Sequence, residues 1–322
     1  MLGRWLGPLL VLAGLVVVGS GVHSAQEQRQ FAEPSREVTL HIPTRYEAPE
    51  PPPERDPLPT PSESRAAFEE RYPQQAAANR GDGPGEDHWA LLIGINEHLG
   101  AVADNHVSRE DAELLREVLL DAAWHDERIV LMADTDATGA MIREGLSWLA
   151  RKAGDDATVL LHYSGHSKKW YGDGGAILDM ALWPTDDDFL RREELATALD
   201  AIPHGRLWGN FATCNAEGLH EAGLDDGRRV LSYSSRTPEK SYEDPDAGNS
   251  VWGRFLIAEV LRQDGQPDTA ATTVQEAFEL AAPRAHERTV GQRYGPQTPV
   301  LYDGLGAAFH LEVEAATRLV AR

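Results

Sequence analysis

From residue 87 onward the chain alternates between two hydrophobic patterns. Short apolar runs at 88–95, 128–133, 157–166, 206–214 and 229–236 are typical of strands buried on both faces. Stretches with apolar positions at helical spacing lie between or after them, at 109–124, 139–153, 189–202 and 251–262. Strands that alternate with helices predict right-handed βαβ units. We therefore expect an α/β fold, a three-layer sandwich with a mostly parallel central sheet flanked by helices.

The N-terminal residues show a different pattern. An apolar run from Trp5 to Val18 follows Arg4, and small residues such as Ser24 and Ala25 come after it. This order predicts a signal peptide over 1–25 and export to the periplasm or the extracellular space. The alternative is an uncleaved N-terminal anchor in a membrane, because the run approaches the length that spans a bilayer.

Residues 26–86 predict a linker rather than a packed domain. Seven prolines fall between Pro49 and Pro61, which favours polyproline II or disorder. The run "EVTLHI" within this segment is compatible with a strand or with a partly ordered tether. We accordingly place a largely disordered linker at 26–86 and one catalytic or binding domain at 87–322.

Charge excludes one class of partner and favours another. The formal net charge is -22 and the isoelectric point is about 4.9, so the summed field repels nucleic acid. Basic protein or peptide substrates would instead be attracted. We expect no contact with a membrane except through the N-terminal segment, if it is retained.

Two ends of predicted strands carry chemistry. The run "VLLHYSGH" ends at His166, and "LWGNFATC" ends at Cys214, the single cysteine of the chain. In one parallel sheet both residues would emerge at the same edge, where α/β folds form their sites. A thiol becomes a nucleophile when a neighbouring base takes its proton, and imidazole commonly does so. Taken alone, a single cysteine at the end of a buried strand is more commonly a small apolar core residue.

The ordered set of motifs carries a family resemblance. "ALLIGIN", "HYSGH", the strand-end cysteine, "SSRTPEKSYE" and "QTPVLYDG" occur in this order over residues 87–310. Together they resemble bacterial metacaspases and related caspase-like cysteine peptidases. The residues around the cysteine depart from the family pattern, because Ala212 stands where metacaspases carry an aspartate.

The resemblance implies roles for three residues. Cys214 would be the nucleophile of an endopeptidase, and His166 would accept its proton and later protonate the leaving amine. The backbone N–H groups of Ser167 and Cys214 would form the oxyanion hole.

The resemblance also implies a substrate pocket. Asp111 and Ser164 match two of its family positions, whereas the third is Ala212. Glu243 occupies the place where true caspases carry an arginine that recognises aspartate. Acidic groups at these positions favour a guanidinium or ammonium over a carboxylate. We therefore predict cleavage after Arg or Lys.

Other readings of the same residues remain open. The protein could be an inactive caspase-like binding or scaffold protein, since the motif around Cys214 is degraded. It could also be a serine or metal-dependent hydrolase, because "GHSKK" partly matches a nucleophile elbow at Ser167. We expect no metal at His162 and His166 and no required cofactor. Ca²⁺ at the acidic run 186–188 is a minor alternative to a solvated loop.

Overall fold

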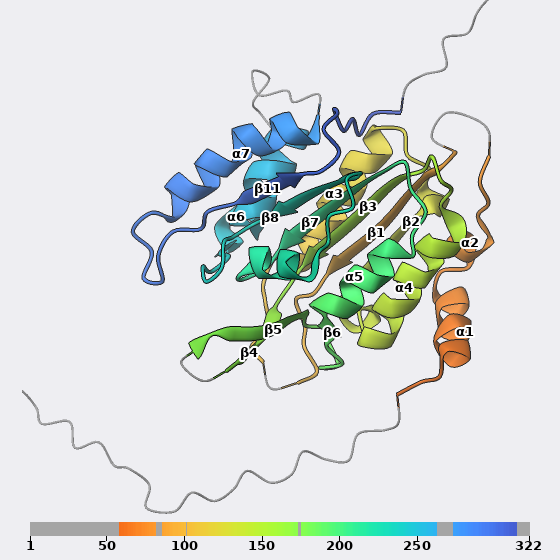
Figure 1. The fold of residues 1–322 in the computed structure, drawn as a ribbon, viewed down its shortest axis with the longest axis horizontal. Helices are drawn as coiled ribbons and strands as arrows, with labels where there is room; N and C mark the ends of the chain where they lie inside the picture. Colours follow the sequence, from red (N-terminus) through yellow and green to blue (C-terminus); the bar gives the residue numbers. More distant parts are fainter. Residues whose placement is uncertain (1–57, 82–85, 101, 173–174, 263–272, 314–322) are drawn as a thin grey trace, which may run out of the picture. The chain divides into compact units, whose positions relative to one another are not determined.

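The computed structural model describes residues 58–81, 86–100, 102–172, 175–262 and 273–313 (Figure 1). The chain divides into two units, 1–55 and 56–322, and every described residue belongs to the second. The predicted signal peptide, most of the linker and the run "EVTLHI" lie outside the described residues, so export stays a prediction. In the part of the chain that the structure describes, no helix has the length and apolarity needed to cross a membrane.

A six-stranded sheet forms the centre of the domain, in the order β11-β8-β7-β3-β1-β2. Five neighbouring strands are parallel, and β11 runs antiparallel to β8 at one edge. The bounds, in sheet order, are β11 Val300–Asp303, β8 Arg229–Tyr233, β7 Arg206–Ala212, β3 Thr158–Ser164, β1 His88–Gly94 and β2 Ile129–Ala133. Burial on both faces explains why the inner strands are continuous apolar runs.

Helices cover both faces of this sheet, and each face has its own hydrophobic core. Side chains of α4 (Gly139–Lys152) and α5 (Arg192–Asp200) pack in one core. Side chains of three further helices pack in the second core. These helices are α3 (Ser108–Asp121), α6 (Val251–Gly253) with the π-helix Arg254–Leu261 that continues it, and α7 (Val274–Thr289). The predicted three-layer α/β fold is confirmed (Figure 1).

Shorter elements surround the central sheet, and most of them follow the carboxyl ends of its strands. A three-stranded antiparallel sheet contains β4 (Ser167–Tyr171), β5 (Ile177–Leu182) and β6 (Leu190–Arg191). A two-stranded sheet pairs β9 (Glu243–Asp244) with β10 (Asn249–Ser250). The 3-10 turns are Asp126–Arg128, Asp134–Asp136, Ala216–Ala222 and Pro245–Ala247. The hydrophobic periodicity of the sequence predicted neither of these small sheets. It also placed the start of the 189–202 helix three residues before α5 begins.

The linker boundary near residue 86 is wrong, because the packed domain begins earlier. Helices α1 (Pro61–Arg71) and α2 (Pro73–Ala77) occupy the end of the predicted linker. Thr60 and Glu63 form a capping box that starts α1, with Pro61 at the first helical position. The prolines here begin helices rather than extend a polyproline segment. Only Ser64 and Phe68 of α1 are buried, and one of the two is polar, so the sequence of this helix carries no amphipathic signal.

Phe68 tests whether α1 belongs to the folded domain. Its ring is 1% exposed and lies 6.1 Å from the Trp148 ring of α4, centroid to centroid. Replacing Phe68 by alanine is expected to lower the free energy of unfolding by about 3–5 kcal/mol, measured by urea denaturation. Glu70→Ala, on the exposed face of the same helix, is the control and should change it by less than about 0.5 kcal/mol. Equal stability of the two variants would contradict the packing.

Candidate active site

The register of two neighbouring strands brings the predicted dyad residues to one place. Parallel pairing of β3 with β7 sets Thr158 opposite Arg206 and Ser164 opposite Ala212, an offset of 48 residues. His166 and Cys214 are also 48 residues apart, and each lies two positions beyond its strand. The two residues therefore leave the same sheet edge from adjacent strands.

Hydrogen bonds tie together the two segments that carry these residues. The Gly165 N–H donates to the carbonyl of Ala212 at 3.2 Å. The Ser167 hydroxyl donates to the carbonyl of Cys214 at 2.6 Å. The pairing of β3 with β7 thus continues past the ends of the strands and holds the histidine segment beside the cysteine segment. Ser167 lies in an extended strand without a positive φ, so its Cβ causes no backbone strain.

The imidazole of His166 has a defined orientation. Its Nε2 lies 2.8 Å from the carbonyl oxygen of Ala103, in the loop between β1 and α3. A carbonyl oxygen can only accept, so Nε2 carries the hydrogen and Nδ1 is the basic nitrogen of the neutral ring. The rings of His98 and Trp183 flank it, with centroids 5.0 and 6.1 Å away. Burial lowers the pKa of His98, and the nearby His166 lowers it further. The neutral form of His98 is therefore favoured beside the His166 ring.

Cys214 is a free, partly exposed thiol. Its Sγ lies 3.7 Å from the carbonyl oxygen of Ser241, a weak contact that leaves the sulfur available. The chain turns sharply after it, because Asn215 has a positive φ of 57° and leads into the 3-10 turn at Ala216. The Asn215 N–H donates a hydrogen bond to the carbonyl of Glu239, which holds Asn215 in this turn.

The two amides predicted for the oxyanion hole have different surroundings. The Trp183 N–H donates to the carbonyl of His166, which makes Ser167 and Leu182 a non-hydrogen-bonded pair of β4 and β5. The Ser167 N–H is therefore directed away from β5. The Cys214 N–H donates no hydrogen bond to any described residue. Both amides remain available for a substrate oxygen.

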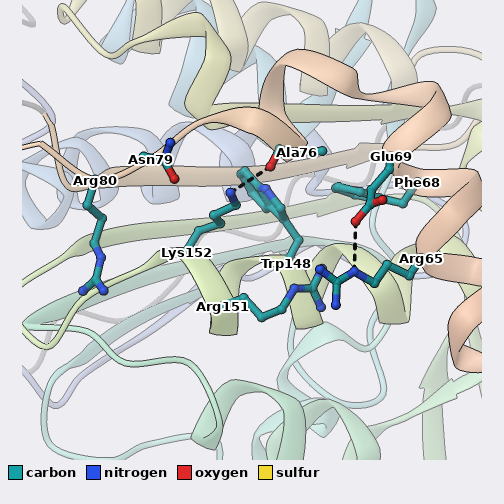
Figure 2. Close-up of a pocket in the computed structure, with 9 residues that line it drawn as sticks. All are labelled: Arg65, Phe68, Glu69, Ala76, Asn79, Arg80, Trp148, Arg151 and Lys152. Carbon is teal, nitrogen blue, oxygen red and sulfur yellow. Dashed lines mark hydrogen bonds and ion pairs between the residues drawn. The ribbon is translucent and has the colours of Figure 1, made fainter.

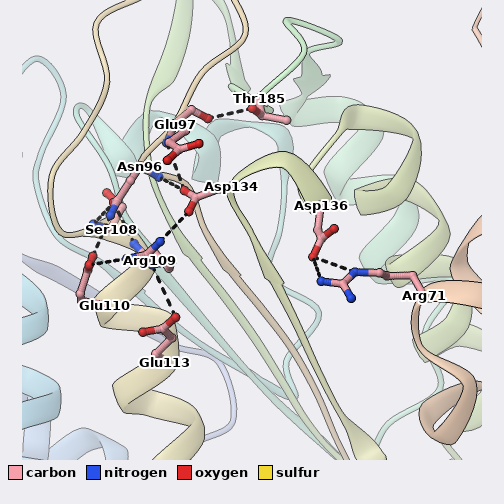
Figure 3. Close-up of polar contacts among 10 residues, drawn as sticks. All are labelled: Arg71, Asn96, Glu97, Ser108, Arg109, Glu110, Glu113, Asp134, Asp136 and Thr185. Carbon is pink, nitrogen blue, oxygen red and sulfur yellow. Dashed lines mark hydrogen bonds and ion pairs between the residues drawn. The ribbon is translucent and has the colours of Figure 1, made fainter.

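A buried polar network at the ends of β1 and β2 went unrecognised in the sequence (Figure 3). Asp134, with a positive φ of 49°, accepts from the N–H groups of Asn96 at 2.7 Å and Glu97 at 3.1 Å. Its other oxygen binds the Arg109 guanidinium at 3.1 Å. Asn96 in turn accepts from the N–H of Ser108 at 2.6 Å, at the start of α3. Asn96 belongs to the quoted motif "ALLIGIN", the one signal that could have pointed to this network.

The network holds both ends of the loop that contacts His166. Asn96 anchors its beginning and the start of α3 anchors its end, and Ala103 lies between them. The N–H of Asn105 also donates to the carbonyl of Asn96 at 2.8 Å. The position of the Ala103 carbonyl, and with it the orientation of His166, depends on these contacts.

Asp111 and Ser164, both predicted to line the pocket, are in contact. The Ser164 hydroxyl donates to Asp111 Oδ2 at 2.9 Å, and the Ser250 N–H and the Asn249 amide donate to Oδ1 at 3.0 and 3.2 Å. Asp111 is fully buried. Burial raises the pKa of its carboxyl to about 6, although the hydrogen bonds from Ser250, Ser164 and Asn249 favour the ionised form.

Glu243 joins the same region from β9. Its Oε1 accepts from the N–H groups of His106 at 2.7 Å and Val107 at 3.1 Å, just before α3. Glu243 is paired with Ser250, whose N–H binds Asp111. Within the described residues, neither carboxylate has a basic partner: every hydrogen bond that they accept comes from a neutral group.

The residues considered above for a metal or calcium site, His162 and the acidic run 186–188, make other contacts. His162 is buried in the sheet, where Asn210 contacts its Nδ1 at 3.0 Å, and burial lowers its pKa to about 3. The acidic run is not a solvated loop: Asp186 accepts from the N–H of Gly139 at the start of α4, and Asp188 pairs with Arg143. Among the described residues, no group of three or more His, Cys, Asp or Glu side chains could hold a metal ion.

Comparison with known proteins places these features in context. The profile of the caspase domain (Peptidase_C14) matches residues 87–278. Metacaspase-4 of Arabidopsis thaliana is 26% identical over 184 residues, which cover 54% of this chain and 42% of that protein. Metacaspase-6 of the same plant is 26% identical over 163 residues, or 47% and 43% of the two chains. The chain therefore spans about two fifths of the length of these relatives.

A solved structure supports the fold. The crystal structure of protein GSU0716 from Geobacter sulfurreducens matches with a TM-score of 0.53 and 15% identity. The match covers 67% of this chain and 92% of that one. At this identity the similarity concerns the arrangement of helices and strands alone.

Proposed function

Because the chain belongs to the caspase domain family, we propose that it is a cysteine endopeptidase whose nucleophile is Cys214 and whose general base is His166. The observation that carries the proposal is the β3–β7 register, which delivers both residues to one sheet edge. The metacaspase relatives support the same class of activity.

The proposed reaction uses the groups described above. The Cys214 thiol passes its proton to Nδ1 of His166, and the thiolate attacks the carbonyl carbon of the scissile bond. The oxyanion accepts hydrogen bonds from the N–H groups of Ser167 and Cys214. His166 then returns the proton to the leaving amine as the C–N bond breaks. A water molecule, deprotonated by His166, hydrolyses the remaining thioester and releases the thiol.

The proposal includes a preference for Arg or Lys before the cleaved bond. Asp111 and Glu243 support it, because they place two carboxylates without basic partners beside the β3 edge. Ala212, paired with Ser164, contributes no charge to this region. A substrate guanidinium or ammonium could contact Glu243, which is partly exposed, whereas the fully buried Asp111 would act on it only through its charge; a substrate carboxylate would be repelled.

Covalent labelling tests this function on the full chain. An electrophilic peptide ketone ending in Arg is expected to label the protein, and mass spectrometry is expected to find the adduct on Cys214. The matched peptide ending in Asp should label it at least about tenfold more slowly, since one lost charge pair costs about 1.4 kcal/mol or more. Labelling by the Asp peptide alone would overturn the specificity. No labelling or turnover by either peptide would favour the binding or scaffold protein.

A further inference from the structure

A polar cavity of about 240 Å³ lies between the N-terminal helices and α4, away from the dyad segments (Figure 2). Four basic side chains line it: Arg65 from α1, Arg80 from the segment after α2, and Arg151 and Lys152 from the end of α4. One acidic residue, Glu69, lines it with them. Positive charge is concentrated here in a chain whose net charge is -22.

Two of the four cations already have carboxylate partners. Arg65 pairs with Glu69 at 2.9 Å, one helical turn away on α1. Arg151 pairs with Glu144 at 2.5 Å, and the carboxylate of Glu144 is 7% exposed. These pairs hold the two guanidinium groups at the wall of the cavity, and they leave N–H donors of each group unused.

The other two cations have no carboxylate partner among the described residues. The Lys152 ammonium donates to the carbonyls of Ala76 at 2.8 Å and Ala78 at 2.6 Å, which carry no formal charge. Arg80 forms no ion pair within the described residues. Asp87 lies near it: Oδ1 of Asp87 accepts hydrogen bonds from the Trp89 indole and the Gly154 N–H, and its Oδ2 lies beside Gly154, as the Arg80 guanidinium does. The ammonium of Lys152 therefore has no countercharge in contact with it, and Arg80 has a carboxylate near it but none within ion-pair distance among the described residues.

The surroundings of Lys152 show the effect of this concentration of charge. Burial lowers the pKa of its ammonium, and the neighbouring Arg151 and Arg65 lower it further, while Glu69 acts in the opposite direction. An anion bound among these groups would remove the mutual repulsion.

The cavity walls define the chemistry of that anion. Phe68 and Trp148 line the cavity but are each 1% exposed, so they offer no ring face on which a base or aromatic group could stack. The accessible groups are guanidinium, ammonium and the Asn79 amide. The volume equals that of roughly eight liquid water molecules, which suits one or two phosphoryl groups. Two parallel N–H groups of one guanidinium can donate to two oxygens of the same phosphate.

We propose that this cavity binds a small phosphate-class oxyanion, which bridges the α1–α2 segment to the end of α4. The caspase domain match begins at residue 87, so Arg65 and Arg80 come from outside the region that the family shares. The site is thus a feature of this chain's own N-terminal helices. It does not depend on the proposed peptidase activity.

Binding to the full chain tests the site. Inorganic phosphate or pyrophosphate is expected to raise the thermal unfolding midpoint above that in sodium chloride of equal ionic strength, and calorimetry should give one site. Arg80→Gln removes a cation that has no ion-pair partner in the described protein, so the fold should persist. This variant should bind the oxyanion about tenfold more weakly or worse.

Arg116→Gln is the matched control, because it removes one positive charge from α3, on the opposite face of the sheet. It should bind like the unaltered protein. The proposal is overturned if neither phosphate nor pyrophosphate acts beyond ionic strength, or if Arg80→Gln and Arg116→Gln weaken binding equally. The proposal is supported if Arg80→Gln weakens the binding of phosphate or pyrophosphate and Arg116→Gln does not.

Discussion

Replacing Cys214 by alanine is expected to abolish peptide hydrolysis while leaving the fold unchanged. The sulfur makes one weak contact, to the Ser241 carbonyl, so its loss removes little packing. It is also the only thiol of the chain, and no second cysteine can replace it. The value of kcat/KM should fall by about three orders of magnitude or more. The measurement is hydrolysis of an Arg-ending fluorogenic peptide, with circular dichroism and thermal unfolding as the test of the fold.

His166→Ala should lower kcat/KM comparably, and the double variant should be no slower than the slower single variant. Residues that act as a unit are strongly non-additive, because removing either one already disables proton transfer to and from the sulfur. Additive losses would show that the two residues act separately. Activity that survives Cys214→Ala but is lost in Ser167→Ala would contradict the thiol mechanism and favour a serine hydrolase. Activity lost only with a chelator would favour a metal-dependent one.

Asp111→Asn is expected to weaken the preference for a basic residue and to change how stability depends on pH. Asparagine keeps the shape, its oxygen can accept from Ser250 and Asn249, and its amide can donate to the Ser164 hydroxyl. The variant should therefore fold. Its side chain carries no charge, so kcat/KM for an Arg-ending peptide should fall by about tenfold or more.

The sign of the stability change follows from the pKa of Asp111. Burial raises that pKa from 3.8 to about 6, so the folded protein holds a proton that the unfolded chain releases. The resulting stabilisation is fully present below about pH 4 and is lost as the pH rises through about 6. On account of this group, the unfolding free energy of the unaltered protein should therefore be about 3 kcal/mol lower at pH 7 than below pH 4.

Urea denaturation from pH 4 to pH 7 measures this effect. The unfolding free energy of Asp111→Asn, relative to the unaltered protein, should rise across that range. Glu70→Gln is the control, because it removes a carboxylate on the exposed face of α1. Parallel pH profiles for Asp111→Asn and the unaltered protein would contradict the raised pKa. An unchanged Arg preference would exclude Asp111 from substrate recognition.

Local pattern predicted the central sheet because burial and secondary structure agree along it. The inner strands lie between two helical layers, so their sequences are continuous apolar runs, and the helices between them are amphipathic. Burial and sequence pattern no longer agree in the elements outside the central sheet. β4, β5 and the helix α1 are only partly buried, and they carry weak periodicity. The prolines near residue 61 mark helix starts there, a role that composition alone does not distinguish from a linker.

By itself the sequence determined the fold class, the family resemblance and the identity of the two candidate catalytic residues, because these depend on local pattern and on spacing. Only the tertiary structure decided which distant residues meet. It brought Asp111, Ser164 and Glu243 to one place from α3, β3 and β9, and it joined Asn96 to Asp134 across two strands. It also gathered four cations around the cavity beside α4. Such contacts come from chain crossovers and side-chain packing, which leave no periodic signal in the sequence.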